Sequence, residues 1–245
     1  MLRHVRIACV GVAVIGWLGL SCSALHAGTI IKLSLGSDAP ADVKFDGTTL
    51  STVDATVLPV PGDQGTAIDY QDFLSGETDV VLPDASFSMS GLTAAANASV
   101  FGNFLVIQNF TGGTFELYDT APGYGLLLSG MLNNSTLTGP IGPPATGALF
   151  TTSFAMVTGG SLAPLIDADT LTLSMNLSSI NNGAGLKVTP VGGPAPYTLD
   201  AFEADASVNI AAEPVPEPAS MALLLIGTLL ACVSIQRQHS WKQRS

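Results

Sequence analysis

The side chains that could do chemistry in this sequence are almost all carboxylates. The three histidines, His4, His26 and His239, lie near the two ends of the 245-residue chain, and residues 28–212 contain no His, Cys, Arg or Trp. This composition excludes from that region the Ser-His-Asp and Cys-His groups of nucleophilic catalysis. It also excludes zinc, copper and haem sites that depend on His or Cys, and arginine clamps for phosphate. We therefore expect that the protein is not an enzyme.

Paired carboxylates could still hydrolyse a glycosidic bond, one acting as the acid and the other as the base or nucleophile. Two groups of acidic residues have suitably short spacing: Asp167 with Asp169, and Asp200 with Glu203 and Asp205. Enzymes that act on sugars usually stack the rings on aromatic side chains, and Trp is absent from residues 28–212. Ordinary loop carboxylates are therefore the preferred interpretation.

Calcium binding needs only oxygen ligands. Two groups of acidic residues are weak candidates for a calcium site: Asp167 with Asp169, and Asp38 with Asp42 and Asp46. Neither group has the spacing of an EF-hand loop. No other metal or cofactor is expected.

The charge of the chain is unevenly distributed. Residues 28–217 contain three lysines and all 19 acidic residues, which gives 3 − 19 = −16, while the five other basic residues lie near the chain ends. Nucleic acids and anionic membranes attract proteins through Lys and Arg. We therefore expect no nucleic-acid partner for this region.

The elements that carry these side chains have the alternation of β-strands. In residues 170–177, Leu171, Leu173, Met175 and Leu177 alternate with polar residues, as on a strand with one buried face. The same spacing recurs at Ile31/Leu33/Leu35, Phe87/Met89, Phe115/Leu117, Tyr124/Leu126/Leu128, Phe150/Thr152/Phe154/Met156 and Ala206/Val208/Ile210.

Turn signals separate these strands, among them Asp46-Gly47, Gly112-Gly113, Asn133-Asn134 and Gly192-Gly193. Short strands divided so often predict an all-β domain, an antiparallel β-sandwich or an open barrel, over residues 28–212. The domain has no cysteine, so it must be stabilised by its core alone.

Residues 1–27 have the pattern of a secretory signal peptide. Arg3 and Arg6 precede an apolar run, and small residues follow up to Ala27, the expected cleavage point. Cleavage after Ala24 is an alternative, as is lipidation of Cys22, although the residues before Cys22 match a lipoprotein signal poorly. We expect a signal helix here that is removed on export.

The C-terminal residues 213–245 combine a linker, an apolar run and a basic end. Proline at alternate positions predicts an extended linker over 213–218. Residues 219–235 contain no charge and predict a single transmembrane helix close to the minimum length. In residues 236–245, Arg237, Lys242 and Arg244 predict a cytoplasmic end, since positive charge holds a helix end inside the cell. A plain membrane anchor with a proline-rich stalk is the alternative.

This arrangement resembles the PEP-CTERM sorting signal. The resemblance covers roughly residues 214–241 and rests on Val215, Pro216, Glu217 and Pro218, followed by the apolar segment and the basic end. It implies recognition at Pro216–Pro218 by an exosortase, a membrane-embedded cysteine transpeptidase that cuts near the motif. It says nothing about residues 28–212.

Three hypotheses follow for the ectodomain. The first is a structural or adhesive protein of the cell surface or extracellular matrix, exported, held transiently in the inner membrane by residues 219–235 and then released to the outer envelope or the medium. The second is a carbohydrate-binding module, which would show exposed Tyr or Phe in a row on a sheet face and could bind extracellular polysaccharide. The third, and least favoured, is a carboxylate-based envelope hydrolase.

Overall fold

The structure is a computed structural model that describes residues 28–35, 41–53, 63–71, 74, 85–119, 125–143, 147–193 and 195–215. Their regular structure is almost entirely strand, with short 3-10 helices η3 (Ala163–Leu165) and η4 (Ile180–Gly183). The strands are β1 (Gly28–Ser34), β2 (Val43–Phe45), β3 (Thr49–Thr52), β4 (Asp63–Tyr70), β5 (Ala85–Ser90), β6 (Leu92–Ala94), β7 (Ser99–Phe101), β8 (Leu105–Thr111), β9 (Thr114–Asp119), β10 (Leu126–Pro140), β11 (Ala148–Gly159), β12 (Thr172–Ser178), β13 (Val188–Pro190), β14 (Tyr197–Leu199) and β15 (Phe202–Ala212).

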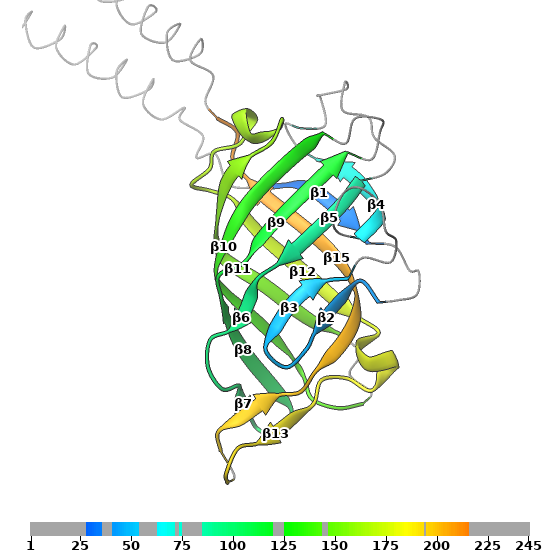
Figure 1. Cartoon of the computed structure of the whole chain (residues 1–245), viewed down its shortest axis with the longest axis vertical. Helices are drawn as coiled ribbons and strands as arrows, with labels where there is room; N and C mark the ends of the chain where they lie inside the picture. The colour runs from blue at the N-terminus through cyan, green and yellow to red at the C-terminus, as the bar shows by residue number, and fades with distance from the viewer. Residues whose placement is uncertain are drawn as a thin grey trace, which may run out of the picture.

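The main sheet closes into an antiparallel barrel (Figure 1). Neighbouring strands follow the order β1-β4-β5-β9-β10-β11-β12-β15, and β15 pairs back with β1, which gives a closed ring of eight strands. The prediction of an all-β antiparallel domain is confirmed. The sheet is closed, however, and this closure replaces the sandwich or open barrel that we expected.

Four short strands extend the barrel lengthwise. β10 pairs with β9 through residues 126–131 and with β8 through residues 135–140. Similarly, β15 pairs with β1 near its end and with β2 near its start, and β2, β3, β6 and β8 follow one another between β15 and β10. Figure 1 shows this second set of strands below the first. The long strands therefore hold two sets of short strands in one continuous wall.

The interior is filled by the apolar residues of the alternating pattern. In β12, Leu173, Met175 and Leu177 are buried whereas Thr172 and Asn176 are exposed, as predicted. Aromatic rings occupy the part of the core between β2, β8, β11 and β15: Phe110 lies 5.7 Å from Phe45 and 6.2 Å from Phe150, and Phe45 lies 5.6 Å from Phe202. The first two pairs are edge-to-face and the third is tilted; aromatic pairs contribute about 0.5–1.5 kcal/mol each beyond their burial.

The alternation changes face inside the longest strand. We read Asn133-Asn134 as a turn between strands, but β10 runs through both residues and Asn134 has a left-handed φ of 51°. Leu132 before it and Ser135 after it are both buried, although residues three apart on a regular strand face opposite sides. The buried side chains of β10 therefore switch from even-numbered to odd-numbered residues at this point. The paired strand β11 follows: Phe150 and Thr152 are buried, whereas Met156 is 43% exposed opposite Met131, which is 50% exposed. The expectation that Met156 shares the buried face is therefore wrong.

Several predicted segments lie outside the described residues. They are the signal peptide 1–27 with Ala27, the motif residues Pro216, Glu217 and Pro218, the apolar segment 219–235, the basic residues Arg237, Lys242 and Arg244, and also Asp38 and Tyr124. Among the residues that the structure does describe, no helix has the length and apolar character needed to cross a membrane.

Candidate functional site at the barrel rim

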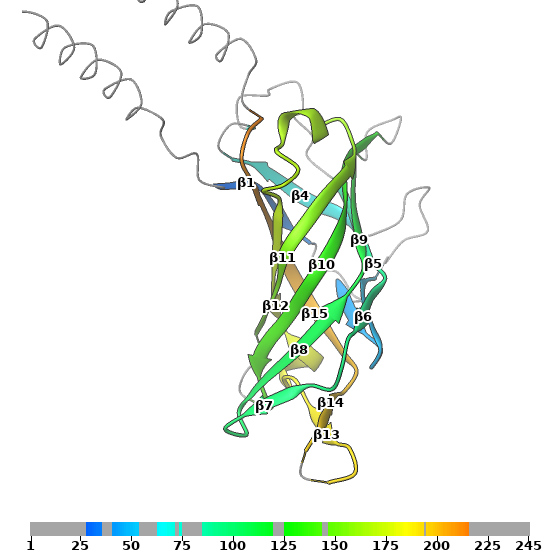
Figure 2. The same cartoon turned by 90° about the vertical axis from the view of Figure 1, so that its left-hand side faces the viewer.

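The first and last strands of the described chain meet at one end of the barrel. Gly28, the first residue of β1, pairs with Ala212, the last residue of β15. Figures 1 and 2 show this end beside η3, the short yellow-green helix, while β7 and β13 lie at the opposite end. The predicted cleavage point after Ala27 and the predicted motif at 216–218 are therefore each within a few residues of this end.

The three residues after β15 are hydrogen bonded to the barrel. The N–H of Asp167 donates to the carbonyl of Glu213 (2.9 Å), and the N–H of Val215 donates to the carbonyl of Leu165 (3.1 Å). The N–H of Glu213 donates to Oγ1 of Thr170 (2.8 Å). We expected an extended, poorly hydrogen-bonded linker from residue 213, but residues 213–215 form an antiparallel bridge with the chain near Ile166.

Residues 160–170, which we call the rim segment, are themselves fixed to β10. The N–H groups of Ser161 and Leu162 donate to the carbonyls of Leu126 (3.0 Å) and Leu127 (2.9 Å). The side chains of Leu162 and Ile166 are each only 2% exposed and anchor the segment in the core. The rim segment thus gives the C-terminal residues 213–215 a rigid support.

Asp167 and Asp169 shape the rim segment. Oδ1 of Asp167 accepts a hydrogen bond from the N–H of Asp169 (3.1 Å), and the carbonyl of Asp167 accepts from both the N–H (3.1 Å) and the hydroxyl (2.9 Å) of Thr170. This is the local bonding of an Asx turn. In the described part of the chain no three His, Cys, Asp or Glu residues are grouped to hold a metal ion. The carboxylate of Asp167 therefore stabilises the turn, in which Asp169 takes part through its backbone N–H.

The second group of calcium candidates is separated in the fold. Asp42 is 2% exposed, and its Oδ2 accepts from the N–H of Ala206 (2.6 Å). Asp46, at the other end of β2, accepts from the N–H groups of Thr49 (2.7 Å) and Thr48 (2.8 Å). These hydrogen bonds, with that from Thr49 the largest cause, hold the pKa of Asp46 below its usual value. Asp42 thus bonds β15 while Asp46 closes the β2–β3 turn, and the two carboxylates do not share one site.

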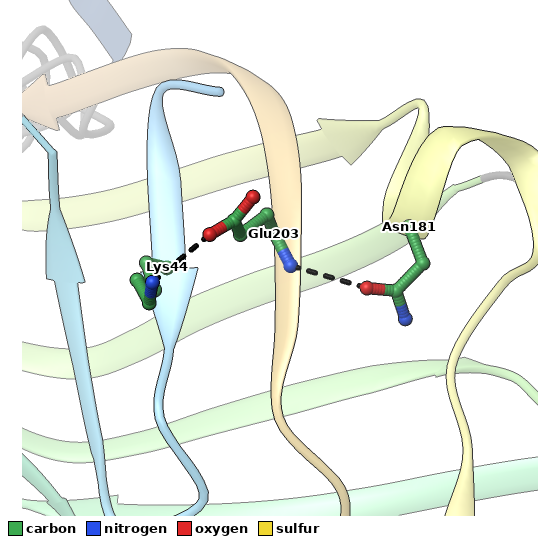
Figure 3. A network of polar contacts seen from close by, with 3 residues as sticks. All are labelled: Lys44, Asn181 and Glu203. Atoms are coloured by element: carbon green, nitrogen blue, oxygen red, sulfur yellow. Dashed lines mark hydrogen bonds and ion pairs between the residues drawn. The ribbon is translucent and has the colours of Figure 1, made fainter. Parts of the chain in front are cut away.

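Two of the candidate hydrolase carboxylates, Glu203 and Asp205, lie on the outside of the sheet, whereas Asp200 lies between β14 and β15. Glu203 is exposed and Asp205 partly exposed, alternating with the buried residues of β15. Oε1 of Glu203 accepts a hydrogen bond from Nζ of Lys44 (3.0 Å) in an ion pair, and the backbone N–H of Glu203 donates to Oδ1 of Asn181 (3.3 Å; Figure 3). Asp200 instead accepts from the hydroxyl of Thr189 (2.8 Å). The contacts of Glu203 connect β15 to β2 and to the η4 turn. An exposed ion pair of this kind contributes about 0.2–1 kcal/mol to stability.

The end opposite the rim segment exposes large apolar side chains. Phe101 and Phe104, around the β7–β8 turn, are 54% and 65% exposed, and Val191, in the β13–β14 hairpin, is 45% exposed. The N–H of Ala98 donates to the carbonyl of Tyr197 (2.7 Å) and joins the two hairpins. We call Phe101, Phe104 and Val191 the distal apolar tip. Residues 95–115 and 188–199 contain no charged side chain, so the tip is neutral within an acidic protein.

Sequence reasoning placed some of these residues and missed others. Val215, the first residue of the predicted motif, is 43% exposed at the rim. Leu165, which accepts from Val215, and Thr170, which accepts from Glu213, were missed because the nearby Asp-Ala-Asp-Thr was considered only as a loop with weak calcium candidates, although it is also a turn signal. No protein-family model, curated protein or solved structure matches the chain.

Proposed function

We propose that this protein is an exported surface or extracellular-matrix protein with a structural or adhesive role, processed through its PEP-CTERM-like C-terminal signal. The observation that carries the proposal is that the two ends of the barrel differ. Gly28 and Val215, the residues beside the two predicted processing points, lie at one end, and the distal apolar tip lies at the other. A protein held by its C-terminal segment would then present the tip away from the membrane.

The physical character of the barrel suits display at high density. A closed barrel has no long open strand edge through which neighbouring copies could pair. The charge of −16 over residues 28–217 makes copies repel one another at short range. The exosortase and the export machinery are the partners in delivery, and residues 219–235 would hold the chain in the inner membrane until processing. Extracellular polysaccharide is the proposed matrix partner.

The test is to substitute Pro216, Glu217 and Pro218 together by Ala in the full-length chain, in cells that contain an exosortase. The wild type should lose its C-terminal segment and reach the envelope or the medium. The variant should still lose its signal peptide but remain at the larger size in the inner membrane. Immunoblotting of cell fractions measures the size and location of both chains. Equal processing of the two would contradict the sorting proposal.

A carbohydrate-binding module is the second candidate, and the exposed rings of Phe101 and Phe104 favour it. They lie around one turn and not in the row on a sheet face that we expected of such a module. A glycan array with the mature protein and with a variant carrying Phe101→Ser and Phe104→Ser would test it. Binding that disappears in the variant supports the module, and no binding by the wild type rejects it. No observation favours the hydrolase, since Glu203 is engaged with Lys44.

A further inference from the structure

We infer that the rim segment is a clamp that sets the C-terminal boundary of the mature protein: the bond cut during processing lies beyond Val215, and residues 213–215 stay docked on the barrel afterwards. This inference rests on the proposed function, because it concerns the same sorting signal. It adds a positioning role for residues 160–170 that the motif itself does not contain.

The clamp uses the backbone groups that a protease would need. Glu213 is bonded through both its N–H and its carbonyl, and Val215 through its N–H. Proteases and other peptide-binding proteins commonly bind an extended chain by adding it as a strand, through these same groups. Residues 213–215 must therefore leave the rim before an enzyme can take them. Three hydrogen bonds, each worth about a factor of five in population, keep the undocked fraction on the order of one per cent.

The spacing of the prolines fits the hydrogen bonds between residues 213–215 and the rim segment. The bridge between Ile166 and Pro214 is made by hydrogen bonds of their neighbours, Asp167 with Glu213 and Leu165 with Val215. Pro214 therefore occupies a position where no N–H donor is needed, which is where a strand tolerates proline. Prolines at 214, 216 and 218 leave the odd-numbered residues with their donors. The same alternation that marks the sorting signal is thus compatible with docking up to Val215.

Burial decreases steadily along this segment. Ala212 is 1% exposed, Glu213 and Pro214 are partly buried, and Val215 is 43% exposed. The chain passes from the core to solvent within three residues, and within the described part of the chain the hydrogen bonds to the rim segment extend to Val215. Among the described residues of the signal, Val215 is therefore both docked on the rim segment and exposed to solvent.

The cleavage chemistry is that of a cysteine transpeptidase. A thiolate adds to the carbonyl carbon of the cut bond, the C–N bond breaks, and the nitrogen takes a proton and leaves as the amine of the C-terminal fragment. Water or an amine acceptor then takes the acyl group, and the thiol is released. The clamp restricts which carbonyl can be presented and takes no part in the bond changes.

Thr170→Val tests the clamp with little change of shape. It removes the hydroxyl that accepts from Glu213 (2.8 Å) and donates to the carbonyl of Asp167 (2.9 Å). Thr198→Val is the matched control, because it removes a hydroxyl bonded to the carbonyl of Thr189 (3.3 Å) in the distal hairpin. All chains are expressed at full length in exosortase-containing cells, and the purified products are analysed by intact mass and by amide hydrogen exchange.

The wild type and Thr198→Val should each end at or beyond Val215. Thr170→Val should give additional species that end before Val215, and its Glu213 amide should exchange about five- to tenfold faster, with β12 exchange unchanged. A wild-type end before Val215, or equal Glu213 exchange in the two variants, would overturn the clamp. If every chain keeps residues 216–245, the proposed sorting function fails, while the exchange measurement still decides whether the clamp exists.

Discussion

Gly160 is the residue on which the geometry of the rim segment depends most directly. It has a φ of +111°, a backbone conformation that side chains rarely adopt. A Cβ at this position would overlap the carbonyl oxygen of Leu127 and lie 2.6 Å from the nitrogen of Leu128. Both atoms belong to the β10 backbone, which is held between strands and cannot move aside. We therefore expect Gly160→Ala to displace the rim segment and to weaken the docking of residues 213–215.

The magnitude follows from two contributions. The unfavourable φ costs about 1–3 kcal/mol for a residue with a Cβ, and forcing an extra carbon into a packed site costs about 1–3 kcal/mol more. The sum is about 4 kcal/mol, a large part of the 5–15 kcal/mol typical of a folded domain. With a urea dependence of about 2 kcal/mol per molar, the unfolding midpoint should fall by about 2 M.

Gly142→Ala provides the matched control. Gly142 also has a positive φ, +73°, but a Cβ there would meet nothing within 4 Å. Only the conformational cost remains, about 1–2 kcal/mol, or a midpoint shift of less than about 1 M. Urea unfolding followed by circular dichroism measures both variants. Equal losses of stability would refute the reasoning, because the close approach of Gly160 to β10 would then have no energetic consequence.

Two further predictions concern the core and the pH dependence. Phe110→Ala removes the ring that contacts Phe45 and Phe150 and should lower the free energy of unfolding, measured in urea, by about 3–5 kcal/mol. Phe101→Ala at the exposed tip should lower it by less than about 0.5 kcal/mol. Similar losses for the two variants would contradict a stabilising role of the aromatic core. Burial, with a smaller effect of Asp119, raises the pKa of Tyr70 to about 12. Because an unfolded chain loses this proton near pH 10, stability should decline between pH 10 and 12, by about 1–2 kcal/mol after allowance for partial exposure. Tyr70→Phe should reduce that decline, and identical urea midpoints for the two proteins at pH 9 and again at pH 11 would argue against it.

The strands were predictable because their information is local. Residues such as Leu173, Met175 and Leu177 alternate with polar residues, and a period of two has one simple interpretation. The Asp46-Gly47 signal likewise marks the turn between β2 and β3. Closure of the barrel was not predictable in the same way. It depends on pairing between Gly28–Ser34 and residues 207–212, and no local pattern specifies which distant strands will pair.

The change of face in β10 shows where local reading fails. An Asn-Asn pair is a normal turn signal, because Asn tolerates left-handed backbone conformations. In β10 the pairing with β11 continues past Asn134. The left-handed φ of Asn134 therefore changes which residues face inward without ending the strand. The pairing of β10 with β8, β9 and β11 decides the outcome, and those contacts are spread along the whole sequence.

The candidate site was accessible to sequence reasoning only in part. The motif beginning at Val215 was visible as a pattern of prolines and charge next to an apolar segment. The support of Val215 by Leu165 and of Glu213 by Thr170 was hidden, because hydrogen bonds between segments more than 40 residues apart leave no mark on residue types. Asp167 was singled out as a carboxylate with ligand chemistry, and its side chain instead caps a turn that positions the support.

The most direct test of the account is the intact mass of the protein recovered from the envelope or the medium of cells that contain an exosortase. We predict a chain that begins at Gly28 and ends at or shortly beyond Val215, so that residues 1–27 and the segment 219–245 are both absent. A chain that retains residues 219–245, or one that ends within β15, would contradict it.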